Sequence, residues 1–468
     1  MKDNTPIIDF NELLSSIFSG LLIFIFCVSF TELTPLKFLD TEDYIVISEK
    51  WFEAENFDRR SIGYPILIWF HKAVFNGDWE YAMIHFQIIL YVFSSIIFWY
   101  MIKRTFQNIN IYLVSIIMLF CFLNPQSLAF TLALLPESAP LFFALLSLLL
   151  FEKIPSYNDR NKYKVLYISF FSAFSAFFAY LLKPIWLLLV FSIYLFIVIK
   201  LIFKKTFMKS NSLYFGAFFG IFYIGMQFYF TLNGYNSLSS VKDINLNLSI
   251  LRLGKIKGTE NTQMYKYLDA NGLIKQISER NWTDQPNEYE EFSNFKNIPK
   301  KYLINSEFWA SSLSNKNNFK AFFIKTCERI PKFFTTSAEN GTVTIFRDGY
   351  INYLYQAGYS FFHKKFTFLL ILSYSLLAFI LSYRSQYILN RHSSIIIVSI
   401  LVLAFAIGVV SFTYQNQLFL RMRAGVNPLV IFIFIYPLIY LIDNCLGKEK
   451  LKFSLLKLMK ASKVKRQN

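Results

Sequence analysis

Three carboxylates lie within four residues of one another near the N-terminus: Asp40, Glu42 and Asp43, followed directly by Tyr44. An ionised carboxylate can act as a general base, which takes the proton from an attacking hydroxyl when it is held within hydrogen-bond distance. The same residues could instead form a solvated turn in which Asp40 or Thr41 caps the start of a helix. The residue types alone leave both interpretations open.

Several basic residues could bind an anion near these carboxylates. Cations of this kind stabilise the negative charge that develops on a departing phosphate, but each could also be a snorkelling side chain that anchors a helix end. Lys183 lies between two apolar runs, where an unpaired cation would be costly, and Glu137 follows Pro136 beside another apolar run. Glu137 is therefore either a functional carboxylate or the structural partner of Lys183. The candidate phosphate-binding residues are Arg59, Arg60, Lys183, Arg421 and Arg423.

The elements that must position these side chains are membrane helices. Of the 468 residues, 55% are hydrophobic and 16% are charged, and the apolar residues gather into long runs that need lipid. A transmembrane barrel would instead show short segments of alternating hydrophobicity. We therefore expect an all-α polytopic membrane protein with about ten transmembrane helices. The predicted spans are approximately Leu13–Phe30, Tyr81–Met101, Ile111–Phe122, Leu128–Phe151, Val165–Leu182, Ile185–Phe203, Leu213–Leu232, Phe366–Leu381, Ser394–Phe412 and Val426–Leu441.

The charge pattern predicts how the chain is oriented. The formal net charge is +17, but the Lys and Arg residues lie mostly in short connections between apolar runs, so we expect no nucleic-acid partner. Those basic connections and the basic tail after Leu441 are expected to face the cytoplasm, with both termini on that side. The four cysteines show no CxxC spacing, which argues against a disulfide framework or a zinc site.

The expected domain organisation has four parts. Residues 1–232 form an N-terminal transmembrane module with a first outer loop at 31–80, and residues 233–365 form a large outer loop. Residues 366–445 form the C-terminal transmembrane helices, and residues 446–468 form a basic cytoplasmic tail.

Each large outer loop contains an apolar stretch too short to span a membrane. The stretch from Ile62 to Phe75 has apolar residues at helical spacing, and the stretch from Phe319 to Phe334 interleaves rings with Lys and Arg. Both patterns predict helices that lie in the membrane interface. The fold of residues 236–300 does not follow from the sequence.

The order of motifs resembles a known family. Asp40-x-x-x-Tyr44 follows the first span, and Arg59-Arg60-Ser61-Ile62-Gly63-Tyr64-Pro65 follows on the same loop. This order is similar to that of the multispan glycosyltransferases of the GT-C class, in particular the bacterial branch related to protein O-mannosyltransferases and lipid A aminoarabinose transferases. The similarity is firmest over roughly the first 200 residues. Weaker landmarks are Gln87, Asn124-Pro125, Pro136-Glu137, Lys183-Pro184 and Arg421 to Pro428.

The resemblance implies a glycosyltransferase of the bacterial cell membrane. A sugar would move from a polyprenyl-phosphate donor to an acceptor hydroxyl at the outer face, with inversion, and Asp40 would be the base with Asp43 as its rival. The acceptor would be a glycan, a lipid or a protein. No tightly bound metal is expected, although the carboxylates could bind a divalent cation weakly. Residues expected to line the substrate cavity are Glu42, Tyr44, Tyr64, Gln87 and Glu137.

Two other functions fit the same composition. A surface-polysaccharide polymerase or ligase also acts on lipid-linked glycans, but it predicts catalytic Arg or His residues in late outer loops and no role for Asp40. A transporter or flippase predicts paired halves with charged or Gly/Pro-broken positions in mid-span, and no internal repeat is visible. No phosphate-cradling loop of the nucleotide-binding type occurs, which favours a lipid-linked donor over a nucleotide sugar.

Overall fold

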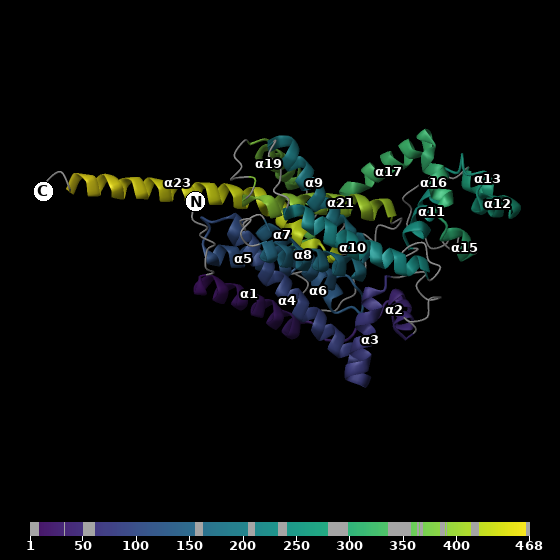
Figure 1. Ribbon diagram of the computed structural model, residues 1–468, viewed down its shortest axis with the longest axis horizontal. Helices are drawn as coiled ribbons and strands as arrows, with labels where there is room; N and C mark the ends of the chain where they lie inside the picture. Colours follow the sequence, from purple (N-terminus) through teal and green to yellow (C-terminus); the bar gives the residue numbers. More distant parts are fainter. Residues whose placement is uncertain are drawn as a thin grey trace.

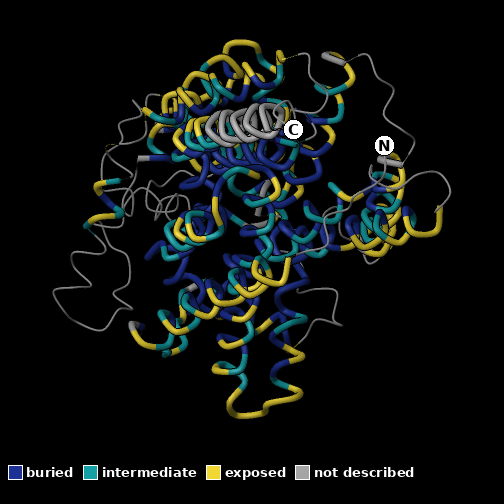
Figure 2. Tube along the Cα trace, turned by 90° about the vertical axis from the view of Figure 1, so that its left-hand side faces the viewer, coloured by how far each residue is buried: buried dark blue, intermediate teal, exposed yellow. Residues whose placement is uncertain are grey.

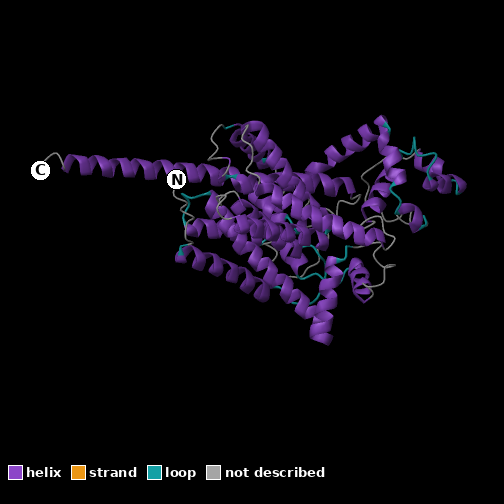
Figure 3. Cartoon of the chain, in the orientation of Figure 1, coloured by secondary structure: helices purple, strands orange, loops and turns teal. Residues whose placement is uncertain are grey.

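The computed structural model of the chain describes residues 9–464 except 32, 50–60, 155–161, 205–210, 233–240, 279–297, 336–356, 363–364, 366–367, 384–388, 390 and 413–420. Within these residues the regular structure is entirely helical (Figure 3). The one departure is an isolated parallel β-bridge between Leu36 and Ala133. The expected all-α fold class is confirmed for this part of the chain.

The helices follow one another along the chain with short breaks. The N-terminal part contains α1 (Phe10–Phe30), α2 (Leu39–Glu49), α3 (Gly63–Phe75), η2 (Asn76–Asp78), α4 (Trp79–Thr105), α5 (Ile111–Phe122), α6 (Pro125–Thr131), α7 (Ala139–Lys153), α8 (Lys162–Leu182), η5 (Pro184–Trp186), α9 (Leu187–Lys204) and α10 (Asn211–Leu232). The remainder contains α11 (Val241–Leu253), α12 (Gln263–Ala270), α13 (Leu273–Ser278), α15 (Lys300–Leu303), α16 (Glu307–Ser314), α17 (Lys316–Thr335), α19 (Leu369–Ser382), α21 (Ser393–Phe412) and α23 (Asn427–Val464).

The long helices form one bundle. α8 packs against α7 and α10, α4 packs against α1 and α7, and α21 packs against α9. Figure 1 shows α2, α3 and α11–α17 at one end of this bundle and the projecting part of α23 at the other. Figure 2 looks along the bundle and shows buried chain at its centre and exposed chain around it. Many exposed residues are large and apolar, such as Phe18 on α1 and Ile224 on α10, as expected of a lipid-facing surface.

Among the described residues, six helical stretches are long and apolar enough to cross a membrane, or up to seven if the bent pair α5 and α6 counts as one span. The chain is therefore a multi-pass membrane protein, while ten spans stay a prediction. α10 and α19 contain shorter apolar stretches, Leu213–Tyr229 and Leu369–Ser382. The six are Phe10–Ser29, Gly63–Thr105, Lys162–Leu182, Pro184–Ile202, Ser393–Ser411 and Asn427–Gly447.

The prediction of one continuous helix from Leu128 to Phe151 was wrong. α6 ends at Thr131 and α7 begins at Ala139, and none of the seven residues between them is helical. Pro136 lacks a backbone N–H and cannot lie within a helix without breaking its hydrogen bonds, so the apolar composition alone was misleading. The break predicted at Asn124-Pro125 is confirmed, because α5 and α6 meet there at an angle of 65°.

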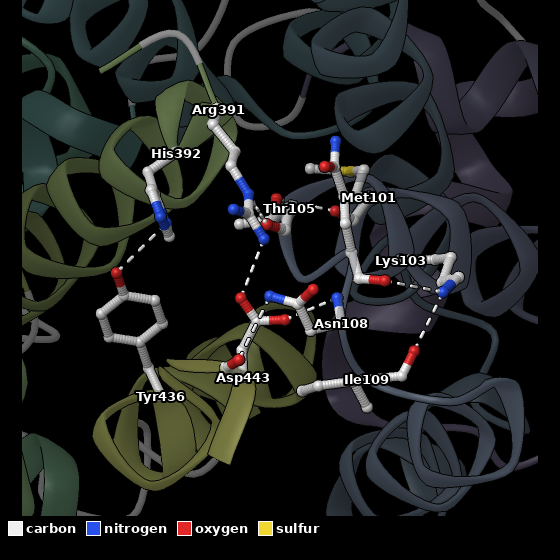
Figure 4. A network of polar contacts seen from close by, with 10 residues as sticks. Met101, Lys103, Thr105, Asn108, Ile109, Arg391, His392, Tyr436 and Asp443 are labelled. Atoms are coloured by element: carbon white, nitrogen blue, oxygen red, sulfur yellow. Dashed lines mark hydrogen bonds and ion pairs between the residues drawn. The ribbon is translucent and has the colours of Figure 1, made fainter. Parts of the chain in front are cut away.

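A polar network joins the end of α4, the residues just before α21 and the middle of α23, at the end of the bundle away from α2 (Figure 4). Arg391 donates from Nη2 to Oδ2 of Asp443 at 2.8 Å and from Nε to the carbonyl of Thr105 at 2.6 Å. Asp443 also accepts the backbone N–H of Asn108 at 2.8 Å. Arg391 belongs to a connection whose basic residues predict a cytoplasmic location, and it also joins helices to one another.

The described part of residues 236–300, whose fold did not follow from the sequence, joins residues up to Ser314 in a second, smaller core. α11, α12, α13, α15 and α16 bury residues such as Ile250, Leu268 and Phe308 against one another. α17 connects this helical subdomain to the bundle, because it packs against both α16 and α21. The two apolar stretches predicted to be interfacial are confirmed as helices, α3 and α17, and their place in the interface stays a prediction.

The start of α3 depends on a glycine. Gly63 packs so closely on α8 that a Cβ atom there would lie 2.6 Å from the carbonyl carbon of Leu181. We expect Gly63→Ala to lower the free energy of unfolding by about 1–3 kcal/mol, because backbone atoms must move apart. Thermal unfolding in detergent measures this change. Gly77→Ala is the matched control, since no atom lies within 4 Å of its added Cβ, and equal destabilisation by both variants would contradict the packing argument.

Candidate functional site

The irregular segment between α6 and α7 holds the connection between α1 and α2 in place. Leu36 donates its N–H to the carbonyl of Leu132 at 3.2 Å, and its own carbonyl accepts the N–H of Leu134 at 3.0 Å. Thr41 adds a hydrogen bond from Oγ1 to the Leu134 carbonyl at 3.3 Å. Because these bonds lie just before and within the first turn of α2, they place Asp40 beside the segment that carries Glu137.

Four charged side chains from distant parts of the chain meet at this point. Arg421 donates from Nη1 to Oδ2 of Asp40 at 2.6 Å and from Nε to Oε1 of Glu137 at 2.8 Å. Nζ of Lys183 lies 3.2 Å from the same Oε1. We name Asp40, Glu137, Lys183 and Arg421 the charge cluster. The sequence singled out all four residues, but it left Glu137 open between a functional and a structural role and did not pair Arg421 with either carboxylate.

Because the charge cluster is largely buried, its charged side chains depend on one another for stabilisation. The side chain of Glu137 is fully buried, whereas those of Lys183, Arg421 and Asp40 are 11%, 15% and 28% exposed. Burial raises the pKa of Glu137, but the charges of Lys183 and Arg421 outweigh it and leave this pKa below its ordinary value. Burial lowers the pKa of Arg421, but the charges of Glu137 and Asp40 outweigh it and leave this pKa above its ordinary value. The pKa of Lys183 lies below its ordinary value, because burial outweighs the charge of Glu137. The charges of the cluster thus favour the ionised forms of Glu137 and Arg421.

Glycine and proline backbones make this approach possible. Lys183 is extended between α8 and η5, where Pro184 starts a new turn and prevents α8 from continuing. A Cβ atom at Gly425 would lie within bonding range of the Glu137 carbonyl, so only glycine lets the chain before α23 pass this close. Ser61 donates to the carbonyl of Leu182 at 3.0 Å and ties the start of α3 to the same place. Sequence reasoning did not select Ser61 or Gly425.

The other predicted cavity residues lie around the charge cluster in different environments. Glu42 is exposed, and Asp43 is partly buried one turn of α2 after Asp40. The rings of Tyr44 and Tyr64 meet edge to face with centroids 5.2 Å apart. Gln87 is buried and donates to the carbonyl of Ala133 at 2.9 Å, so it holds the irregular segment.

Two buried polar atoms beside the cluster make no hydrogen bond with any group that the structure describes. They are the hydroxyl of Tyr64 and Oε2 of Glu137. A buried polar atom without a partner costs free energy, so these two atoms favour a bound hydroxyl or water.

The structure bears on the remaining predictions only in part. Arg59 and Arg60 lie outside the described residues, so their predicted contact with a donor phosphate stays a prediction. In the part of the chain that the structure describes, no group of three or more His, Cys, Asp or Glu side chains is placed to hold a metal ion. The possible weak binding of a divalent cation is not tested by this arrangement.

Arg423 lies in a second polar cluster, at the C-terminal end of α17. It is fully buried and donates from Nη1 to the carbonyls of Phe333 and Phe334, at 2.5 and 2.9 Å. These carbonyls belong to the last turn of α17, where a helix leaves its acceptors unpaired and attracts cations. Arg423 also donates to Gln126 at 3.1 Å. Arg423, one of the five residues predicted to bind a donor phosphate, thus caps a helix in this structure, and its contact with a phosphate stays a prediction.

The sequence did not predict that the residues around Arg423 form one cluster. Asn124 accepts the N–H groups of Gln126 and Ser127 as the N-cap of α6, and it also accepts from Nδ2 of Asn427 at 2.6 Å. Ser127 donates to the carbonyl of Ala424 at 2.8 Å. The only signal in the sequence was the capping pair Asn124-Pro125, which predicts a helix start but not what docks against it.

Comparison with protein-family models, with curated proteins and with solved structures finds no similar protein. The functional interpretation therefore depends on the residues and their geometry, together with the motif resemblance.

We expect Glu137→Gln to lower the free energy of unfolding by about 3–5 kcal/mol, because it leaves Lys183 and Arg421 buried without their shared anion. Chemical unfolding in detergent measures the loss. Adding Lys183→Met to Glu137→Gln should recover part of it, since one unpaired cation is removed. Glu42→Gln, on an exposed residue, is the control.

The charge of Glu137 also predicts a pH dependence. Because its pKa is lower in the folded than in the unfolded protein, its contribution is complete above the ordinary glutamate value of 4.5 and is lost as the pH falls through the folded value. Acid should therefore destabilise the wild type more than Glu137→Gln. An identical pH profile for both proteins would contradict the ionised state of Glu137.

We expect Arg423→Met to loosen α17, because it leaves the carbonyls of Phe333 and Phe334 buried without their donor. Hydrogen exchange should become at least about tenfold faster in the last turn of α17, which corresponds to about 1.4 kcal/mol of local opening. Affinity for polyprenyl phosphate should stay within a few fold. A large loss of that affinity without faster exchange would contradict the capping role and support Arg423 as a phosphate ligand.

Proposed function

We propose that this chain is a glycosyltransferase of a bacterial cell membrane, which moves a sugar from a polyprenyl-phosphate donor to an acceptor hydroxyl at the outer face. The observation that carries the proposal is the contact between Asp40 and Arg421 at 2.6 Å, with Lys183 held beside them through Glu137. It brings a carboxylate that can accept a proton next to cations that can stabilise a departing phosphate. The motif resemblance supports the same assignment.

The proposed reaction is a single displacement. Asp40 accepts the proton of the acceptor hydroxyl while the acceptor oxygen forms a bond to the anomeric carbon of the sugar. The bond from that carbon to the phosphate oxygen breaks, and its electron pair leaves with polyprenyl phosphate. The configuration at the anomeric carbon is inverted, and the negative charge on the leaving phosphate develops beside Arg421 and Lys183.

Glu137 is a positioning residue in this proposal. One of its oxygens, Oε1, accepts from both Arg421 and Lys183, so a single buried carboxylate sets the distance between the two cations. Because its side chain is fully buried, it would not compete with the substrate as a base. Asp40, with 28% of its side chain exposed, is the accessible carboxylate of the charge cluster.

The shared use of Arg421 links donor binding to the release of the base. Arg421 contacts Asp40 and Glu137, so an incoming phosphate competes with Asp40 for the guanidinium group. When the phosphate takes that position, Asp40 loses a cation that keeps it deprotonated and weakly basic. Asp40 thus becomes a stronger base once the donor is present.

This competition predicts opposite effects of one substitution. Asp40→Asn should lower the rate of polyprenyl-phosphate release from a panel of polyprenyl-phosphate sugars by about 10²–10⁴-fold, because the general base is lost. The same variant should bind polyprenyl phosphate several-fold more tightly than the wild type, on the order of 1 kcal/mol, because the competing carboxylate charge is removed. Turnover assays and equilibrium binding of polyprenyl phosphate measure the two effects on the purified protein.

Asp43→Asn is the matched control, one helical turn away on α2, and it should leave both quantities near the wild-type values. Loss of turnover with Asp43→Asn alone would keep the reaction class and move the base to Asp43. An active donor with both variants at the wild-type rate would contradict the mechanism and favour a polysaccharide polymerase or ligase.

A further inference from the structure

A hollow outside the charge cluster lies where the helical subdomain meets the bundle. It is formed by α11, α17 and α21, three helices that converge at the same end of the bundle in Figure 1. With its open mouth included, it encloses about 280 Å³. Its lining residues are Ser249, Leu253, Phe322, Lys325, Thr326, Arg329, Val410 and Ser411.

The polar part of this lining suits an anion with several oxygen acceptors. Lys325 and Arg329 lie one turn apart on the same face of α17. Thr326 and Ser249 add hydroxyl groups, and these two residues and Arg329 are 8%, 6% and 6% exposed. A guanidinium, an ammonium and the Thr326 hydroxyl around one opening supply donors that a phosphate group accepts, whereas the Ser249 hydroxyl donates to the carbonyl of Ser411 at 3.4 Å.

Among the described residues, Lys325 of the hollow forms an ion pair with the exposed side chain of Glu328. Glu328 lies 3.3 Å from Nζ of Lys325, but its side chain is 57% exposed. Exposed ion pairs of this kind contribute little free energy, so a phosphate could take over Lys325 at small cost.

The surroundings of the hollow resemble a membrane boundary. Ser411 is the last residue of the apolar helix Ser393–Ser411, so the hollow lies where that span would leave the hydrocarbon. Phe319 and Phe323, on the outer face of α17, are 52% and 57% exposed. A helix with exposed rings on one face and cations on another places the rings among acyl chains and the cations at the headgroups.

We propose that this hollow binds the phosphate of an anionic membrane lipid, and that the bound headgroup holds α17 and the helical subdomain against the end of α21. The phosphate would accept from Lys325, Thr326 and Arg329, and the acyl chains would lie along the exposed rings of α17. The proposal does not depend on sugar transfer, because no residue of the hollow belongs to the charge cluster.

The test measures lipid binding by the full-length protein in nanodiscs of phosphatidylcholine. Titration with short-chain phosphatidylglycerol, followed by native mass spectrometry, should show a saturable site. The double variant Lys325→Gln with Thr326→Val should weaken that site about tenfold or more, because a charge-assisted and a neutral hydrogen bond are lost together. Lys320→Gln removes the same charge from an exposed position of the same helix and should have little effect.

One further measurement separates the two possible sources of the phosphate. Competition by inorganic phosphate would show that a free phosphate suffices, whereas resistance to it would show that the lipid headgroup and chains are needed. Thr326→Val alone, which keeps the shape of the side chain, serves if the double variant does not fold, and it should weaken binding about threefold. Equal effects of Lys320→Gln and the hollow variants, or no effect of either, would overturn the proposal.

Discussion

The buried carboxylate of Glu137 is the constraint on which this end of the protein depends. A fully buried ionised group is stable only when cations and hydrogen bonds replace the water it has lost. Lys183 and Arg421 provide that replacement, and they come from the turn after α8 and from the segment before α23. Balancing the charge of this one carboxylate therefore requires three segments that are distant in the sequence to meet at one point. Asp40 joins them through Arg421, which makes the start of α2 a fourth member.

The segment before α23 serves two separate purposes through two arginines. Arg421 enters the charge cluster, while Arg423 caps the last turn of α17. Residues two apart on a helical turn point in different directions, so neighbouring positions can reach different partners. The close contact of Gly425 with the backbone of Glu137 fixes the position of the segment that carries both arginines. The proposed donor site and the helical subdomain are thereby connected through one short stretch of chain.

Sequence patterns were most informative where local chemistry decides the structure. Apolar runs predicted the bundle helices, and the cap Asn124 with Pro125 predicted the bend between α5 and α6, because both signals act within a few residues. The same reasoning failed between α6 and α7, where apolar composition hid the break near Pro136. That irregular segment carries Glu137 and pairs with the loop before Asp40. The least helix-like part of the predicted span is thus the part that builds the candidate site.

The sequence by itself determined that the protein is a helical membrane protein, and it identified all four residues of the charge cluster as candidates. Only the tertiary structure decided which of them meet and which arginine joins them. Asp40 and Arg421 are 381 positions apart, and no local pattern records a contact over that distance. Hydropathy and capping depend on neighbouring residues, whereas an ion pair depends on where the whole backbone brings two side chains. For that reason Arg421 and Arg423, equivalent in the sequence, have different partners in the fold.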